Sequence, residues 1–176
     1  GMISEEKLAE RLQKEEQVLC ILNSRERVQK IYQRLKGEGV YHLSTLMYPI
    51  HRKRILKEVR ARLKEGLPCR LIATSLVEPA VDLDFHTVYR ELAGIDSVIQ
   101  AAGRCNREGK LPKEKCRTIV FTMDAKENPG IPAELRLPIA VAEQIAREFE
   151  DISSLEAIHK YFERLYYFKG EKLDAK

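Results

Sequence analysis

The chain has 176 residues, of which 44% are hydrophobic and 33% are charged, and its formal net charge is +4. This length is near that of one domain, and the hydrophobic content is ample for a buried core. No apolar run approaches the roughly 20 residues that cross a bilayer, so we expect no membrane partner.

The cysteines and histidines form no pattern typical of a metal site or a disulfide framework. The four cysteines show no C-x-x-C spacing, and the four histidines are scattered along the chain. Three of the cysteines (Cys20, Cys69 and Cys116) lie in or beside apolar, strand-like runs, where cysteine commonly serves as a small core residue. We therefore expect reduced thiols, no bound metal and a cytoplasmic protein.

The positive charge is concentrated in one block. Residues 24–66 contain 12 Lys and Arg against 4 Asp and Glu, a net charge of +8, whereas residues 1–23 and 67–176 each carry −2. Such a block suits a polyanion such as nucleic acid, but an ordinary solvated helix surface explains it equally well.

The first part of the chain alternates between patterns typical of helices and of buried strands. Amphipathic stretches keep the 3.6-residue period, and the short apolar runs between them fit strands of a parallel sheet. The expected elements are a helix at 3–16 with Ser4 as its N-cap, a strand at 17–22, a helix at 25–36, a strand at 40–44 and a basic helix from Pro49 to Gly66.

The second part repeats this alternation and then turns helical. Strands separated by helical patterns imply right-handed crossovers and a parallel sheet covered on both faces. The expected elements are strands at 69–73, from 87 and at 117–121, a helix at 97–107, a proline-containing connection at 128–138, and helices at 139–149 and 153–168, the last with a capping box at 153–156.

These patterns predict an α/β fold: a parallel sheet of about five to six strands, covered by helices on both faces, with extra C-terminal helices. Residues 1–16 form a helix that leads into the main lobe at 17–127. Residues 128–176 form the proline-containing connection and a helical extension.

Short polar side chains follow three of the expected strands, as Asn23-Ser24, Ser44-Thr45 and Thr74-Ser75. Ligands of open parallel sheets bind outside the carboxyl ends of the strands. Hydroxyl and amide groups beside exposed backbone N–H groups suit the phosphates of a nucleic-acid strand. Each pair by itself is also typical of a helix N-cap.

The expected helix at 97–107 carries a Q-x-x-G-R-x-x-R run. On one continuous helix Gln100, Arg104 and Arg107 share a face, with Ile95, Val98, Ala102 and Cys105 on the opposite, sheet-facing side. Two guanidiniums on a stiff stripe suit a triphosphate, since each donates a planar fork of hydrogen bonds. A solvated basic helix face is the alternative.

The segment from Leu71 to Lys110, LIATSLVEPAVDLDFHTVYRELAGIDSVIQAAGRCNREGK, resembles motifs five and six of superfamily 2 helicases. More narrowly, it resembles the second RecA-like lobe of the CRISPR-associated helicase-nuclease of type I systems. ILNSRERVQKIYQRL is similar to that family's motif four, and YHLSTLMYPIHRKRIL to its motif between four and five. The resemblance runs from about Val18 to Phe121. It departs at Pro79-Ala80, where the family usually has Ala-Gly, so the path of that loop is open.

The resemblance implies roles for particular residues. Arg107 is the arginine finger for ATP held by another lobe, Arg104 supports the same phosphates, and Gly103 belongs to the same ATP-binding set. Gln100 links the nucleotide to the lobe interface, and Asp82 positions the ribose or Arg107. The expected contacts to single-stranded DNA come from Asn23, Ser24, Ser44, Thr45, Arg52, Thr74 and Ser75.

A complete ATPase of this type also needs a G-x-x-x-x-G-K-[ST] loop and an acidic motif for Mg²⁺, and this chain has neither. We therefore expect ATP with Mg²⁺ to be bound mainly by a first RecA-like lobe, and the chain alone to be inactive and free of cofactor. The other partners implied are a nuclease domain, single-stranded DNA and the CRISPR RNA-guided surveillance complex. Two alternatives remain: a lobe of another superfamily 2 helicase, acting on RNA or DNA, and a non-catalytic module that binds nucleic acid or protein.

Overall fold

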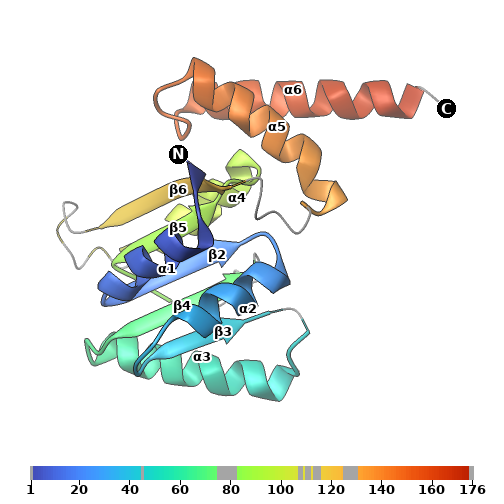
Figure 1. The fold of residues 1–176 in the computed structure, drawn as a ribbon. Coiled ribbons are helices and arrows are strands. Elements are labelled where there is room, and N and C mark those ends of the chain that lie inside the picture. The colour runs from blue at the N-terminus through green and yellow to red at the C-terminus, as the bar shows by residue number, and fades with distance from the viewer. Residues whose placement is uncertain are drawn as a thin grey trace.

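The computed structural model describes residues 2–44, 46–74, 83–106, 109, 112, 116–124 and 131–174. Its centre is a six-stranded parallel sheet, with helices on both faces and two further helices at the C-terminal end (Figure 1). The strand order is β1-β6-β5-β2-β4-β3. The strands are β1 (Met2–Ile3), β2 (Gln17–Leu22), β3 (Val40–Leu43), β4 (Cys69–Thr74), β5 (Thr87–Glu91) and β6 (Arg117–Met123).

The helices divide between two faces of the sheet. On one face α1 and α2 bury Leu8, Leu12 and Val28 against the strands, and on the other face α3 contributes Ile55 and Val59. The third core joins α4 to α5 and α6 (Figure 1). The helices are α1 (Glu5–Lys14), α2 (Arg25–Arg34), α3 (Pro49–Lys64), α4 (Ile95–Ala102), α5 (Ala133–Glu148) and α6 (Leu155–Asp174).

The central strand β2 has β4 on one side and β5 on the other. All six residues of β2 are buried, because helices cover the sheet on both of its faces. The chain leaves β2 through α2, on one face, and leaves β5 through α4, which reaches the opposite core through Ala101. Two neighbouring strands are therefore followed by helices on opposite faces.

The predicted α/β class, the parallel sheet and the C-terminal helices are confirmed. The strand at 17–22 is found with the predicted bounds, and Ser4 caps α1, since its side chain accepts a hydrogen bond from the backbone N–H of Lys7. The pairing of β1 with β6 has no signal in the sequence, because two residues show no periodicity. This pairing and α1 attach residues 2–14 directly to the sheet.

Two predicted helix starts are wrong. Helix α5 begins at Ala133, six residues before the predicted start, and it contains Pro138 in its interior. Proline costs stability inside a helix, but the packing of α5 against α6 and α4 outweighs that local preference here. The capping box at 153–156 is also wrong, because Ser154 rather than Ser153 accepts from the helix, at 3.2 Å from the N–H of Ala157.

Candidate nucleotide and nucleic-acid interface

The parallel register brings the predicted polar pairs to one edge of the sheet. Leu22 pairs with Thr74, and Leu43 pairs with Ala73, so the carboxyl ends of β2, β3 and β4 are level with one another. Ser44 directly follows β3, and Thr74 is the last residue of β4. The structure therefore gathers Asn23-Ser24, Ser44 and Thr74 at one edge, while Thr45 and Ser75 lie outside the described residues.

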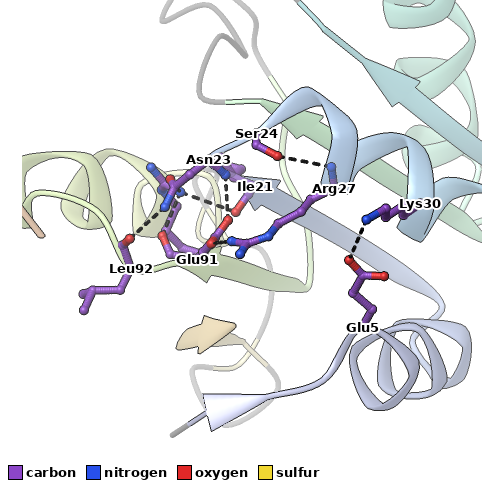
Figure 2. A network of polar contacts seen from close by, with 9 residues as sticks. Glu5, Ile21, Asn23, Ser24, Arg27, Lys30, Glu91 and Leu92 are labelled. Atoms are coloured by element: carbon purple, nitrogen blue, oxygen red, sulfur yellow. Dashed lines mark hydrogen bonds and ion pairs between the residues drawn. The ribbon is translucent and has the colours of Figure 1, made fainter. Parts of the chain in front are cut away.

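Ser24 is the N-cap of α2. Its Oγ accepts a hydrogen bond from the backbone N–H of Arg27 at 3.2 Å (Figure 2). The alternative that this polar pair serves as a helix cap is thus confirmed for Ser24, and its hydroxyl keeps one proton to donate. Ser44 is half-buried, and its carbonyl oxygen accepts from the N–H of Met47 at 3.3 Å.

Asn23 is held by three hydrogen bonds within the chain. Its backbone N–H donates to Glu91 Oε2 at 2.7 Å, and its side-chain amide donates to the carbonyl oxygen of Leu92 at 2.8 Å (Figure 2). Its Oδ1 accepts from Arg90 Nη1, also at 2.8 Å. Both ends of the side-chain amide are therefore already engaged by β5 and the residue after it.

Three buried charges surround Asn23. Glu91 forms an ion pair with the guanidinium of Arg27, which comes from α2 (Figure 2). Arg90 donates to the carbonyl of Glu91 at 2.7 Å. Arg27, Arg90 and Glu91 expose only 2%, 1% and 4% of their surfaces. Burial raises the pKa of Glu91, against the opposing pull of the Asn23 N–H and the two guanidiniums. Burial also lowers the pKa of Arg90, so two cations and one anion share a desolvated space.

Sequence reasoning missed this network. Its signal was present: β5 reads TVYRE, in which an arginine and a glutamate stand in a fully buried strand. Charged side chains are almost never fully buried unless paired, so the strand itself required partners. Identifying those partners as Asn23 and Arg27 needed the strand order, because β2 and β5 are 68 residues apart at this contact.

Thr74 differs from the other polar residues of the edge. It is only 8% exposed, and its Oγ1 has no hydrogen-bond partner within the part of the chain that the structure describes. A buried hydroxyl without a partner costs free energy, since it loses its bonds to water. Thr74 thus holds a donor and acceptor in place at the edge where a strand of nucleic acid is expected.

Helix α3 carries seven of the twelve Lys and Arg of the positive block, against one Glu. Arg52 is half-buried, whereas Lys53 and Arg54 are exposed, with Arg54 Nη2 at 2.9 Å from His51 Nε2. Large apolar side chains are exposed just before this basic helix and in its first turn. They are Leu46, Tyr48 and Ile50, with exposed fractions of 76%, 82% and 84%.

The predicted helix at 97–107 is wrong in its second half. Helix α4 ends at Ala102, with Gly103 as its C-cap. Beyond it the N–H groups of Arg104 and Cys105 bond to the carbonyls of Ala101 and Ala102, each at 3.0 Å, in a tighter turn. The chain then pairs with Phe85: Phe85 N–H donates to the carbonyl of Arg104 at 3.0 Å, and Asn106 N–H donates to that of Phe85 at 3.1 Å. Gln100 and Arg104 therefore do not lie on one continuous α-helix.

The remaining residues of the predicted nucleotide site differ in their exposure, and some lie outside the described residues. Gln100 and Gly103 are exposed and Arg104 is half-buried. The buried residues of α4 are Ile95, Val98 and Ala101, so Ala101 rather than Ala102 faces inward, whereas Cys105 packs against the sheet core as predicted. Asp82 and Arg107 lie outside the described residues, as do Pro79 and Ala80.

No group of three or more His, Cys, Asp or Glu side chains that could hold a metal ion occurs within the described ranges. Among the described helices, none has the length and apolar character of a membrane span. The four cysteines form no disulfide, and Cys20 and Cys69 are buried.

This parallel sheet, with polar residues gathered at its carboxyl edge, agrees with the superfamily 2 helicase lobe that the sequence resembles. Residues 14–110 match the protein family described as CRISPR-associated nuclease/helicase Cas3, C-terminal. The chain therefore belongs to this Cas3 C-terminal family.

Individual relatives agree with this assignment. The CRISPR-associated nuclease/helicase Cas3 of Haloferax volcanii is 30% identical over 138 residues, which cover 64% of this chain and 15% of that protein. The crystal structure of T. fusca Cas3-ADP matches with a TM-score of 0.65 at 19% identity, over 91% of this chain and 21% of the other. A structure of a CRISPR RNA-guided surveillance complex, pre-nicking, contains a chain that matches with a TM-score of 0.58 at 18% identity, over 95% of this chain and 26% of that one. This chain thus spans less than a fifth of the Haloferax relative.

Proposed function

We propose that this chain is the second RecA-like lobe of an ATP-dependent DNA helicase of CRISPR interference, with residues 17–127 as the lobe and 128–176 as its helical extension. The observation that carries the proposal is the coincidence of two facts. The family match covers the four motif segments up to residue 110, and the fold places polar residues from three of those segments at one sheet edge.

In this proposal the edge binds the backbone of single-stranded DNA. Thr74 Oγ1 is buried and lacks a described partner, and Ser24 Oγ keeps a free proton while it caps α2. Ser44 and Arg52, which lies in the first turn of the basic helix α3, extend this set of contacts, and Thr45 and Ser75 belong to it by sequence. Hydroxyls and cations of this kind position a strand without reading its bases.

The nucleotide is ATP with Mg²⁺, held mainly by a first lobe that brings the phosphate loop. The T. fusca relative was solved as Cas3-ADP, which supports an adenine nucleotide as the ligand. Arg104 and Arg107 would neutralise the phosphate charge that develops during transfer, with Gln100, Gly103 and Asp82 around the nucleotide. The nuclease domain and the CRISPR RNA-guided surveillance complex are the further partners, and the matching chain in the surveillance-complex structure supports the latter.

The proposal is tested in the assembled motor, in which this chain is joined to the lobe that carries the phosphate loop. Arg107→Ala should lower ATP turnover by about 10³-fold or more, and Arg104→Ala should also lower it, with the affinity for single-stranded DNA little changed in both. Thr74→Val should weaken DNA binding and leave the chain folded. A motor that keeps full ATP turnover with Arg104→Ala, or a chain that hydrolyses ATP alone, would contradict the proposal.

The same assembled motor tests whether the lobe acts on RNA or on DNA. Phosphate contacts do not distinguish the two, because only groups near the 2′-OH do. Binding of a single-stranded RNA as tight as that of the matched DNA, with equal stimulation of ATP turnover, would favour a helicase of the other class. A chain that binds nucleic acid tightly in its own right, with no nucleotide effect in the assembly, would favour the non-catalytic module.

A further inference from the structure

We propose that Asn23 and Glu91 are positioning residues that couple the strand-binding loop to the helix leading to the nucleotide. This inference rests on the proposed function, since it names how its two sites communicate. Asn23 stands between β2 and α2, at the loop proposed to bind DNA. Glu91 ends β5, four residues before α4 begins at Ile95.

The two loops are bonded directly, without an intervening layer of side chains. The N–H of Asn23 donates to Glu91 Oε2 at 2.7 Å, and its side-chain amide donates to the carbonyl of Leu92 at 2.8 Å (Figure 2). The second bond holds the backbone of the connection into α4, rather than a mobile side chain. A movement of Asn23 therefore pulls on the chain that enters α4.

The bonds lie in a space where they are costly to break. Arg27 pairs with Glu91 from the first turn of α2, and Arg90 donates to Asn23 Oδ1 at 2.8 Å. Each of these charged residues is at least 96% buried. Separating an ion pair in this environment leaves a desolvated charge, so the two loops move together rather than apart.

Helix α4 carries the displacement onward. It has eight residues, and its far end presents the exposed Gln100 and continues into Arg104. Its inner side is packed from both directions, with Ala101 in the sheet core and Ile95 and Val98 in the core formed with α5 and α6. A short helix packed in this way shifts as a rigid body.

Within this proposal Asn23 acts on DNA indirectly. Its side-chain amide donates one hydrogen bond to the backbone of Leu92 and accepts one from Arg90, so we assign it to the network rather than to direct DNA contact. Ser24, with its hydroxyl at the start of α2, remains the group that faces the strand in the proposed function.

The test uses the assembled motor and measures ATP turnover with and without saturating single-stranded oligodeoxythymidine. Asn23→Asp keeps the oxygen that binds Arg90 and removes the donor to Leu92. We expect the ratio of DNA-stimulated to unstimulated turnover to fall by about fivefold or more. Glu91→Gln changes the same network at the end of β5 and should lower the same ratio. The test therefore remains valid if one of the two variants folds poorly.

Two measurements make the result specific. Thermal unfolding of each variant reports whether the fold survives, and Arg164→Gln, which removes an exposed ion pair to Glu148, is the matched control that leaves the ratio unchanged. A ratio that stays at the wild-type value in both network variants, or turnover that falls in equal proportion with and without DNA, would overturn the coupling. If Arg104→Ala left turnover intact, the proposed function would fail instead, so the two failures are distinguishable.

Discussion

The hydroxyl of Tyr161 on α6 lies in the space that a β-carbon at position 94 would occupy. Gly94 is the N-cap of α4, and a methyl group there would collide with Tyr161 Oη and with Asp96 Oδ1. Gly94 has φ −62° and ψ 152°, angles that any residue adopts, so the requirement for glycine is steric. The C-terminal helix is thus fitted to the start of the helix that leads to Arg104.

Gly94→Ala should therefore lower the free energy of unfolding by about 1–3 kcal/mol, since it overpacks the contact between α4 and α6. Gly170→Ala is the matched control: it lies within α6, and a methyl group there would meet no atom within 4 Å, so it should stabilise the chain by about 0.5–1 kcal/mol. Chemical denaturation measures both. Adding Tyr161→Phe to Gly94→Ala should recover part of the loss, and strictly additive effects would argue against the clash.

The buried ion pair gives a second prediction. Arg27→Ala should destabilise the chain by about 3–5 kcal/mol, because Glu91 would then be left buried with one of its two cations missing. Removing Arg164 from its exposed pair with Glu148 should have a far smaller effect, since water solvates both groups. Equal losses in the two variants, measured by urea unfolding, would show that the Arg27 pair is not desolvated in solution.

Thr74 and Thr87 allow the same substitution at a free and at an engaged hydroxyl. Thr74 Oγ1 has no partner among the described residues, so Thr74→Val should leave stability unchanged or raise it by up to about 1 kcal/mol. Thr87 Oγ1 donates to Glu15 Oε2 at 3.2 Å, and Thr87→Val should cost about 1 kcal/mol. Denaturant midpoints compare the two, and a larger loss at Thr74 would place a protein group on its hydroxyl.

Alkaline pH should weaken the fold through Cys69. Burial raises the pKa of this thiol to about 11, from an ordinary value of 9.0. Between these values the unfolded chain loses the proton and the folded chain keeps it, so stability falls as pH rises. The fall in thermal midpoint from pH 8 to pH 10.5 should be smaller in Cys69→Ala than in the wild type, by about 4 °C or more.

The architecture was predictable because the strands and helices of the first 74 residues are periodic and separated by clear stop signals. The strand at 17–22 and the start of the basic helix at Pro49 were confirmed to the residue. The end of α4 was not predicted, since Arg104 and Cys105 continue a helical pattern in the sequence, whereas in the structure this segment also pairs with Phe85 from a distant part of the chain. Pro138 led to the opposite error: the sequence predicted that the helix would start after this proline, but tertiary packing keeps Pro138 inside α5.

Of the site, the sheet-edge residues were predictable from their positions after strands. The different contacts that each of these residues makes were not predictable. Ser24, Asn23 and Thr74 have similar polar side chains in the sequence, yet one caps a helix, one is bonded to β5, and one has a buried hydroxyl without a described partner. Those differences depend on which strands are neighbours, and a single sequence does not contain that information.

The strand order has a consequence for what the lobe can hold by itself. Open parallel sheets take small molecules into a crevice where neighbouring strands send their helices to opposite faces, which here is the junction of β2 and β5. Here the backbone amide of Asn23 and the carboxylate of Glu91 fill that junction, with the buried side chains of Arg27 and Arg90 beside them. A small molecule that entered this junction would have to displace the buried ion pair between Arg27 and Glu91. In the proposed function, the ligands of this lobe therefore bind at the outer edge of the sheet, where a first lobe would complete the site.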